Sequence, residues 1–438
     1  MEYVADLHLH SKYSRAVSQA MVLENIADWA GKKGIDILAA PDWTHPLWFK
    51  EMKSQLTEAY EGLYKLKNGS AALFLLSTEI ASIYSQNGKL RRIHNLVFVP
   101  NLETAEKVSR ELLRRGCNLL SDGRPIVGIS SRNLLEILLS IDKKIILIPA
   151  HVWTPHFGIY GSASGFETLA EAFGDLSKYI YGIETGISSD PFMNWQIPEL
   201  ETRSILSFSD AHSAPKMARE ATIFSLPQPS YMNLGKAISR RDTSCQVSST
   251  IEFYPEEGKY HFTGHRNCGI SLSPDQVKEK GVICPVCQRK LTEGVMIRVQ
   301  QVAGREISTD EPIPQPDKNG VNWIKDPKNN HPPFIKLVPL LEIIAESLNS
   351  TTNGIRVKET FDEVCSKLGS EINVLVNVPL LDIKNSFGVR LAEGIEKVRK
   401  GDIVIEPGFD GEYGKVKIWK EEEVEVRKQE EKSQLGLF

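Results

Sequence analysis

The strongest constraint on the fold is a repeated alternation of short apolar runs with helix-like segments across residues 3–227. The apolar runs occupy residues 3–7, 35–40, 73–76, 95–99, 145–148, 181–183 and 205–208, and segments such as 23–33 and 102–115 have helical periodicity. This alternation favours an α/β domain with parallel strands, either as an open sheet or as a closed barrel. Binding sites in these folds gather at the carboxyl ends of the strands, so the residues after each apolar run are the first candidates for function.

Histidines and carboxylates follow most of these runs. Asp6, His8 and His10 alternate at the end of the first run, so a strand would project them from one face. The other residues of this kind are Asp42, Glu79, His94, His151, Glu184, Asp210 and His212. Any one of them alone is as well explained by a hydrogen-bonded polar group at a strand end, whereas the set predicts metal ligation. Such donors suit zinc, manganese, magnesium or iron, and their number implies two or three ions.

This set resembles the polymerase and histidinol phosphatase (PHP) family of metal-dependent phosphoesterases over about residues 1–227. The residues that carry the resemblance are His8, His10, Asp42, Glu79, His94, His151, Asp210 and His212. The resemblance implies a PHP-type distorted (β/α)7 barrel in which these residues bind the metal ions and Glu79 bridges them. It implies phosphoester hydrolysis by metal-activated water, with Asp210, Glu79 and His212 as the catalytic residues. Many members have a histidine where this chain has Trp43, so His45 and Glu184 remain open as further ligands.

A second metal pattern lies in residues 251–301, where three of the six cysteines cluster. His265 and Cys268 are separated by two residues, and so are Cys284 and Cys287. Two pairs of this kind predict a zinc-ribbon module with one structural zinc in a closed tetrahedral site. His261 is the alternative to His265, which we prefer for its spacing. Chance clustering of reduced thiols is the alternative to the site itself.

The remainder of the chain divides by composition. Residues 226–250 are interpreted as a connector, and the proline-rich residues 312–333 predict a linker or extended arm. Residues 334–420 predict a C-terminal α+β domain that binds DNA, with helices at 340–348 and 357–368 and strands at 374–378 and 404–407. Within it, the sequence Glu-Pro-Gly-Phe-Asp-Gly-Glu-Tyr-Gly at 406–414 resembles a loop near the C-termini of DNA helicases.

The C-terminal segment 421–438 is a charged tail that ends in an apolar tip. An apolar tip on a solvated tether is typical of a docking peptide, and the alternative is a tail that packs on its own domain. The tip resembles the binding peptide of the bacterial sliding clamp (β-clamp) and, more loosely, the archaeal PCNA-interacting box. The resemblance implies clamp binding by Gln434, Leu435, Leu437 and Phe438.

Composition excludes some classes of function. The net charge of −4 excludes a generally polycationic protein, although it leaves open a local basic groove. The longest apolar stretch is far shorter than the roughly 18 residues that span a membrane, and the N-terminus has no export signal. We therefore expect a cytoplasmic protein, and a monomer.

Taken together, the metal set, the ribbon, the C-terminal domain and the tail resemble the endonuclease Q family of DNA repair enzymes. The resemblance implies nicking 5′ to deaminated bases (uracil, hypoxanthine or xanthine) and abasic sites, leaving a 3′-hydroxyl and a 5′-phosphate. A damaged base must then leave the helical stack, and Trp43, Trp153, Phe157 and Tyr160 are candidates for its pocket. Two alternatives remain: a small-molecule phosphatase of the histidinol-phosphate class, and a non-catalytic DNA-binding scaffold.

Overall fold

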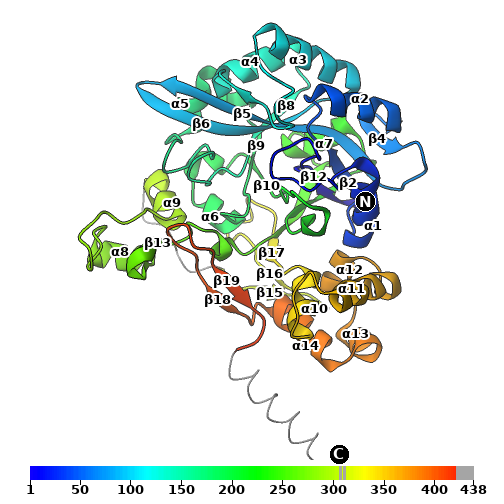
Figure 1. The fold of residues 1–438 in the computed structure, drawn as a ribbon, viewed down its shortest axis with the longest axis vertical. Helices are drawn as coiled ribbons and strands as arrows, with labels where there is room; N and C mark the ends of the chain where they lie inside the picture. Colours follow the sequence, from blue (N-terminus) through cyan, green and yellow to red (C-terminus); the bar gives the residue numbers. More distant parts are fainter. Residues whose placement is uncertain (305–307, 309–311, 421–438) are drawn as a thin grey trace, which may run out of the picture.

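A mixed β-sheet forms the centre of the molecule (Figure 1). The computed structural model describes residues 1–304, 308 and 312–420, so the predicted clamp-binding residues Gln434, Leu435, Leu437 and Phe438 lie outside the described residues. The strands of the sheet are β1 (Glu2–Asp6), β2 (Ile37–Ala40), β3 (Leu56–Tyr60), β4 (Leu63–Leu66), β5 (Leu73–Gln86), β6 (Lys89–Phe98), β7 (Ile126–Val127), β8 (Ile146–Pro149), β11 (Ala221–Ser225), β12 (Gln246–Glu252) and β17 (Phe334–Lys336). Their order is β17-β12-β11-β1-β2-β5-β4-β3, and β6 joins β5 to β8.

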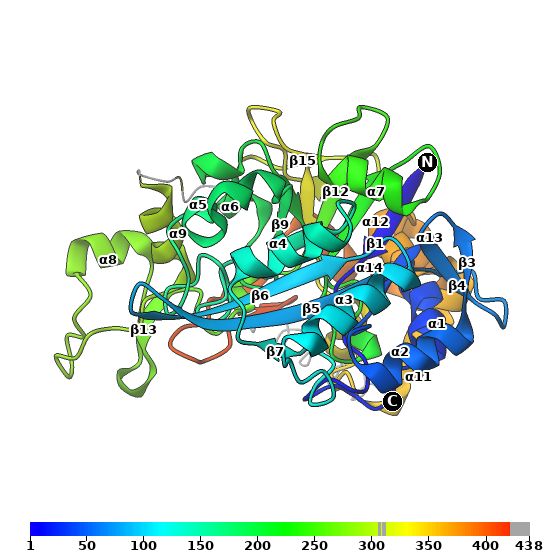
Figure 2. The same cartoon turned by 90° about the horizontal axis from the view of Figure 1, so that it is seen from above.

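The parallel arrangement predicted from the sequence is correct for only part of the sheet, which also includes the parallel pairs β12–β17 and β5–β7. Strands β1, β2 and β5 are parallel neighbours, whereas β6 is antiparallel to both β5 and β8, and β11 is antiparallel to both β1 and β12. The long β5–β6 hairpin (Figure 2) turns at Asn87-Gly88, where both residues have positive φ. Asn-Gly is the strongest two-residue hairpin signal, because both positions of a type I′ turn need positive φ.

Helices cover the sheet and supply most of the apolar core. They are α1 (Leu23–Lys33), α2 (Pro46–Gln55), α3 (Leu102–Arg114), α4 (Ser131–Ile141), α5 (Leu169–Phe173), α6 (Pro191–Trp195) and α7 (Tyr231–Ile238). The predicted helices 23–33 and 102–115 are therefore confirmed. A separate parallel pair, β9 (Gly182–Glu184) and β10 (Ser204–Leu206), completes this part of the chain.

The predicted connector at 226–250 is instead part of the sheet region. Its first half forms α7, whose Tyr231 hydroxyl donates to the main-chain oxygen of Lys144 at 2.8 Å. Its second half begins β12, which pairs with β11 on one side and with β17 on the other. The region from 312 to 336 likewise contributes β17 to the sheet, after the small pair β15 (Gln315–Pro316) and β16 (Asn322–Trp323). The sheet is therefore completed by strands distant in the sequence.

The cysteine-bearing module projects to one side of the sheet (Figure 1). It contains β13 (Thr263–His265), β14 (Ile270–Leu272) and α8 (Pro274–Lys280), and a small apolar core around Cys284. Helix α9 (Val295–Ala303) follows it and returns the chain to the main body. There, buried Arg298 donates to the main-chain oxygens of Tyr160 and Phe166 at 2.9 and 3.0 Å.

The C-terminal part is mostly helical. It comprises α10 (Leu340–Ser347), α11 (Ile355–Leu368), α12 (Glu371–Val376), α13 (Leu380–Phe387) and α14 (Val389–Lys400), followed by a hairpin of β18 (Val404–Glu406) and β19 (Lys415–Lys417). The predicted strand at 374–378 is wrong, because Ser370 caps a helix there and Val374 and Leu375 face its core. A buried ion pair of 2.8 Å between Lys33 on α1 and Glu371 on α12 joins this part to the sheet domain. Across the described residues, each helix is too short or too polar to span a membrane.

Candidate metal centre and its cavity

Two groups of metal-ligand side chains meet where the central strands end. His8, His10 and Asp210 form one group, and Glu79, His94 and His151 form the other. In the first group, Nε2 of His10 lies 2.9 Å from Oδ1 of Asp210, and Nε2 of His8 lies 3.6 Å from the same oxygen. The structure thus brings together six of the predicted metal-site residues from separate elements.

Glu79 lies between the two groups. Its Oε1 faces His94 Nδ1 and His151 Nε2, the latter at 3.0 Å, whereas its Oε2 lies 3.4 Å from His10 Nε2. Although burial acts to raise it, the pKa of Glu79 is held well below its usual range by His94 and the other histidines. The carboxylate is therefore ionised and presents one oxygen to each group, which is the arrangement required of a bridging ligand.

Two further carboxylates orient the histidines of the first group. Glu184 Oε1 accepts a hydrogen bond from Nδ1 of His8 at 2.8 Å, and Asp42 Oδ1 accepts one from Nδ1 of His10 at 3.2 Å. Both histidines consequently direct Nε2 toward Glu79 and Asp210. Carboxylates that bind the outer nitrogen of a histidine in this way fix its tautomer and strengthen it as a ligand.

Asp42 was predicted as a ligand, but it lies outside both ligand groups. Its Oδ2 accepts from the main-chain N–H of Ser11 at 2.6 Å and from the Ser14 hydroxyl at 2.8 Å, while its Oδ1 binds His10. In the structure Asp42 thus contacts His10 rather than joining either ligand group. His45 caps α2 by accepting from the N–H of Trp48, its ring stacks on Tyr13, and it lies outside both ligand groups.

Asp6 and the predicted ligand His212 also lie outside the ligand groups. Asp6 is fully buried and accepts from the main-chain N–H groups of Ser209 and Ala218, both at 3.0 Å, so it fixes the loop that carries Asp210. Burial raises the pKa of Asp6 to about 6, although these hydrogen bonds act against the shift. The His212 ring packs edge-on against His10 at 4.8 Å between ring centres and lines the cavity next to Asp210.

The buried donor atoms fit metal ions. Nε2 of His8, Nε2 of His10 and Oδ1 of Asp210 converge in the buried site and, within the part of the chain described, have no hydrogen-bond partner outside the ligand groups. Leaving such atoms unsatisfied costs about 1–3 kcal/mol each, and more for charged groups. Asp42, His151 and Asp210 also have φ values of 54°, 30° and 47°, a left-handed conformation that is uncommon outside glycine. Residues held in this way cluster at functional sites.

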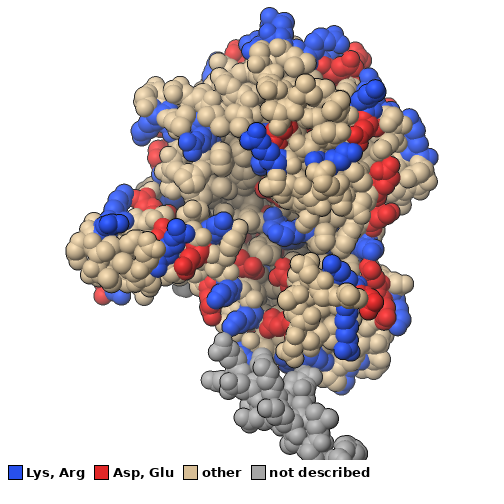
Figure 3. Space-filling view, in the orientation of Figure 1, with Lys and Arg blue, Asp and Glu red and all other residues tan. Residues whose placement is uncertain are grey.

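A cavity of about 510 Å³ opens onto these groups. Its floor includes His94, His151, Asp210 and His212, and its walls include Arg15, Ala81, Ile83, Asp122, Arg124, Ile126, Phe157, Ile187, Lys259, Tyr260 and Tyr413. The face of the molecule in Figure 3 intersperses Lys and Arg with Asp and Glu rather than presenting one broad basic surface. The Lys and Arg side chains that line the cavity are Arg15, Arg124 and Lys259.

Arg124 is the cation of the cavity wall that reaches Glu79, and it was not among the residues predicted from the sequence. Its Nη1 lies 3.3 Å from Oε2 of Glu79, and its main-chain N–H donates to Asp122 at 3.1 Å. Its side chain is 24% exposed, so it reaches both the buried carboxylate and the open cavity. The loop that carries Arg124 has no periodic pattern, and no sequence signal indicated its position.

The candidate pocket aromatics separate into two kinds. Trp43, Trp153 and Tyr160 are almost completely buried in the main core, and therefore do not line the cavity. Trp153 donates to Asn194 at 2.8 Å, and Tyr160 donates to Glu199 at 2.8 Å, so their polar atoms are also satisfied internally. Phe157 does line the cavity, where its ring stacks on His94 with 4.5 Å between ring centres.

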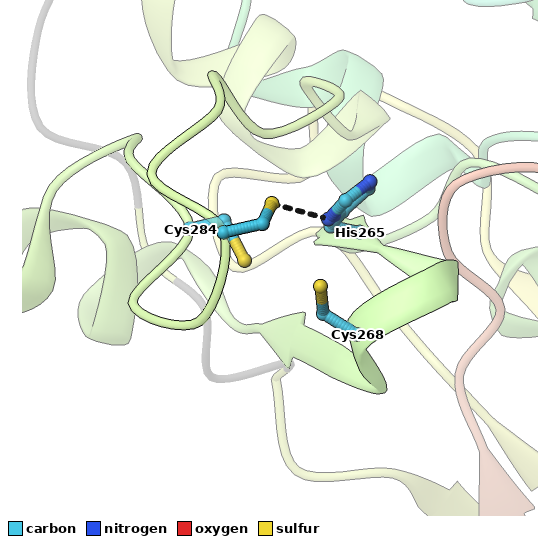
Figure 4. A group of neighbouring side chains, drawn as sticks. His265, Cys268 and Cys284 are labelled. Atoms are coloured by element: carbon cyan, nitrogen blue, oxygen red, sulfur yellow. Dashed lines mark hydrogen bonds between the residues drawn. The ribbon is translucent and has the colours of Figure 1, made fainter.

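The second metal pattern forms one compact group. His265, Cys268, Cys284 and Cys287 bring four donor atoms together, and Figure 4 shows the cysteine sulfurs gathered beside His265. Nδ1 of His265 lies 3.2 Å from Sγ of Cys287. Burial acts to raise the pKa of Cys284, but main-chain N–H groups and His265 lower it to about 6. The alternative residue, His261, is buried outside this group.

Comparison with known proteins gives relatives along nearly the whole chain. Residues 339–402 match the family described as MJ0043 C-terminal domain. The uncharacterised protein MJ0043 of Methanocaldococcus jannaschii is 28% identical over 62% of this chain, and the chain spans about a third (33%) of that protein's length. The uncharacterised protein YqxK of Bacillus subtilis is 27% identical over 94% of this chain and 98% of its own length.

The solved structures decide the relationship. The lesion-specific endonuclease PfuEndoQ of Pyrococcus furiosus superposes with a TM-score of 0.80 and 27% identity, covering 96% of each chain. This chain is similar to endonuclease Q. A complex of endonuclease Q with a 27-mer duplex, which carries an abasic lesion at the active site, superposes with a TM-score of 0.79 and 27% identity over 96% of this chain and 98% of that one. The similarity to endonuclease Q therefore extends across the sheet domain, the cysteine module and the helical part.

Proposed function

We propose that this chain is a metal-dependent DNA repair endonuclease. It hydrolyses the phosphodiester bond 5′ to deaminated bases (uracil, hypoxanthine or xanthine) and to abasic sites, leaving a 3′-hydroxyl and a 5′-phosphate. The observation that carries the proposal is a buried histidine and carboxylate cluster on the floor of an open cavity. It occurs in a chain that resembles endonuclease Q, which binds an abasic lesion at its active site, over 96% of its length.

We further propose that the sheet domain is a PHP-type distorted (β/α)7 barrel. The parallel strands β1, β2 and β5 support this proposal. Some candidate ligands lie at or just beyond the carboxyl ends of these strands, and others lie where β5 continues past its parallel pairing with β2. The proposed domains are 1–227 for the barrel, 251–301 for the zinc ribbon and 334–420 for the DNA-binding part. Strands β12 and β17 extend the barrel domain beyond its first segment.

The two ligand groups suit two divalent ions, which we assign as zinc, manganese or magnesium. His8, His10 and Asp210 would hold one ion, and His94 and His151 would hold the other, with Glu79 between them. His212 lies outside both groups and would be the nearest ligand for a third ion. Ions bound here would lower the pKa of a bound water and balance the charge of the phosphate. A further zinc in the cysteine group would be structural, because its four donors leave no open position.

The residues around the ions have separate roles in this proposal. Asp210 orients the attacking water, since its side chain lines the cavity beside His10. Arg124 contacts a non-bridging oxygen of the phosphate and offsets its charge. Glu184 and Asp42 hold His8 and His10 in position. The lesion must leave the helical stack, at a cost of a few kcal/mol that is smallest for damaged or mismatched positions.

We also retain the proposal that Gln434, Leu435, Leu437 and Phe438 bind a sliding clamp. The sequence of the tip supports it, with a glutamine followed by leucines and a terminal phenylalanine. Clamp binding would raise the local concentration of the enzyme on DNA without changing the chemistry in the cavity.

Substrate comparison tests the proposed function. The purified protein with manganese is incubated separately with a uracil-containing duplex, the undamaged duplex and histidinol phosphate. We expect a nick 5′ to uracil and little activity on the other two substrates. Phosphate release from histidinol phosphate without DNA cleavage would support the small-molecule phosphatase instead. Lesion binding without any hydrolysis would support the non-catalytic scaffold.

A further inference from the structure

The glycine-rich loop between β18 and β19 reaches back across the molecule to the segment that lines the metal cavity. Figure 1 shows this loop beside β13 of the cysteine module, far from the helices that precede it in the sequence. The main-chain N–H of Gly408 donates to Glu256 at 2.8 Å, and that of Gly411 donates to Lys259 at 2.9 Å. The N–H of Phe262 donates to Gly408 at 2.9 Å. The loop is therefore hydrogen-bonded along residues 256–262.

Close approach of the two backbones explains two of the glycines. A Cβ atom at Gly408 would lie 2.4 Å from the main-chain oxygen of Gly258, and one at Gly414 would lie 2.1 Å from that of Glu256. Any larger residue at either position would push the loop away from the cavity segment. Glycine at these two positions therefore allows the loop to contact the cavity segment.

Asp410 ties the same loop to the cysteine module. Its carboxylate accepts from the main-chain N–H of Arg266 at 2.8 Å and from the Thr292 hydroxyl at 2.5 Å. Its φ of 45° is left-handed, a conformation that aspartate tolerates better than most residues. The loop therefore contacts both residues 256–262 and the cysteine module, and hydrogen bonds fix each of these contacts.

This arrangement places Tyr413 on the wall of the cavity. The Tyr413 side chain remains 66% exposed even though the loop around it is anchored. Lys259 Nζ lies 4.4 Å from the centre of its ring, and both residues line the same cavity as His151 and Asp210. Among the described residues, Lys259 has no carboxylate partner, so its charge is available to a ligand.

We infer that Tyr413 and Lys259 form a nucleotide clamp for the substrate strand: the tyrosine ring stacks on a base next to the scissile phosphate, and the lysine binds a backbone phosphate. This inference deepens the proposed function and rests on it. Exposed aromatic rings beside a cation are the usual elements of single-strand binding, because every base has a face that can stack. Because the loop backbone is already anchored, it loses little freedom on binding, which favours affinity.

Paired substitutions test the tyrosine. Tyr413→Ala should lower kcat/KM on a uracil-containing oligonucleotide by about 5- to 150-fold, mainly through KM, whereas Tyr413→Phe should retain nearly the wild-type value. Hydrolysis of methyl p-nitrophenyl phosphate, which has no base, should be unchanged in both variants. Tyr60→Ala, at an exposed tyrosine on the edge strand β3, is the control and should change neither activity.

The salt dependence of DNA binding tests Lys259. Lys259→Ala should weaken DNA binding and reduce the slope of the logarithm of affinity against the logarithm of salt concentration by about one. Lys259→Arg should restore the slope. An unchanged slope for Lys259→Ala would contradict phosphate binding by this residue.

A binding measurement separates this inference from the proposed function. An oligonucleotide with 2-aminopurine beside the abasic site is titrated with each protein, because stacking on tyrosine changes its fluorescence. We expect the change with wild-type protein and Tyr413→Phe, and its loss with Tyr413→Ala. Equal changes for wild type and Tyr413→Ala would overturn the clamp even if wild type nicks DNA. Failure of wild type to nick any DNA would instead overturn the proposed function, while the fluorescence result still decides the clamp.

Discussion

Glu184 accepts a hydrogen bond from Nδ1 of His8 at 2.8 Å, and both side chains are completely buried. The other oxygen of Glu184 accepts from the main-chain N–H of His151 at 2.7 Å. A single carboxylate therefore positions one residue from each ligand group. Because these two hydrogen bonds are made with His8 and His151, Glu184 would act on bound ions through those two residues.

Glu184→Gln should weaken metal binding while leaving the fold in place. The amide keeps the volume of the side chain but removes the charge that strengthens His8, and such changes typically cost 10- to 100-fold in affinity or activity. The measurement is metal content by mass spectrometry after equilibration against a graded manganese series. Glu136→Gln, on the exposed face of α4, is the control. Metal content equal to wild type at every concentration would contradict the role given to Glu184.

Cys284→Ser should release about one zinc per chain and unfold the cysteine module. A structural zinc contributes directly to folding free energy, and Cys284 lies fully buried in the core of that module. Cys365→Ser removes a cysteine that lies outside the four-donor group and should not change zinc content. If Cys284→Ser retained all of its zinc, the ribbon assignment would be wrong.

Glu252 makes stability depend on pH. Burial, reinforced by Asp190, raises its pKa to about 8, although hydroxyl donors such as Ser207 oppose the shift. The unfolded carboxyl loses its proton near its ordinary pKa of 4.5, whereas the folded one keeps it until about pH 8. The unfolding free energy should therefore fall as pH rises from about 5 to 8, by up to about 1.4 kcal/mol per pH unit.

Glu252→Gln should make this slope shallower, because glutamine keeps an oxygen that accepts from Ser207 and Thr185 but does not titrate. Burial also raises the pKa of Glu220 and of Glu257, so these two residues should retain part of the slope. Urea denaturation at pH 5.5, 6.5 and 7.5 measures the slope for each protein. Glu359→Gln, at an exposed position on α11, should leave the slope as in wild type. Identical slopes for wild type and Glu252→Gln would show that another group titrates.

Deletion of residues 434–438 tests the clamp proposal. A short peptide buries little area and loses its own freedom on docking, so we expect micromolar affinity for the clamp. Turnover on a short oligonucleotide should be unchanged, and pull-down by the clamp should be lost. Insolubility or loss of basal activity in the truncated protein would indicate that the tail packs on its own domain.

The sequence allowed the six grouped candidate donors to be singled out, because the fold places them near strand ends. Residues that follow parallel strands share one edge of a sheet, so His8, Glu79 and Asp210 could be grouped from the apolar runs before them. In the structure, however, Glu79 lies within β5, and Asp210 follows β10 of the separate β9–β10 pair. The same argument did not distinguish ligands from the residues that orient them. Asp42 and Glu184 follow strands in the same way, and only the direction of their hydrogen bonds separates them from His10 and His151.

Other features depended on long-range contacts that no local pattern reports. Strands β12 and β17 join the sheet from segments interpreted as linkers, since their partners lie far away in the sequence. The apolar run at 374–378 was too short to distinguish a strand from a buried helix. Tyr413 reaches the cavity only because its loop docks on residues 256–262. By contrast, the Asn87-Gly88 hairpin is a local feature that could have been recognised from the sequence.

Asp210→Asn is the most direct test of the central claim that this metal centre cleaves DNA. Asparagine tolerates the left-handed backbone at this position and keeps the side-chain volume, but it removes the charge beside His10. With manganese and a uracil-containing duplex, we expect strand cleavage to fall by at least about 100-fold, beyond the usual effect of an orienting residue. Lesion binding, measured by gel shift, should remain close to that of wild type. Cleavage by Asp210→Asn at the wild-type rate would contradict the account.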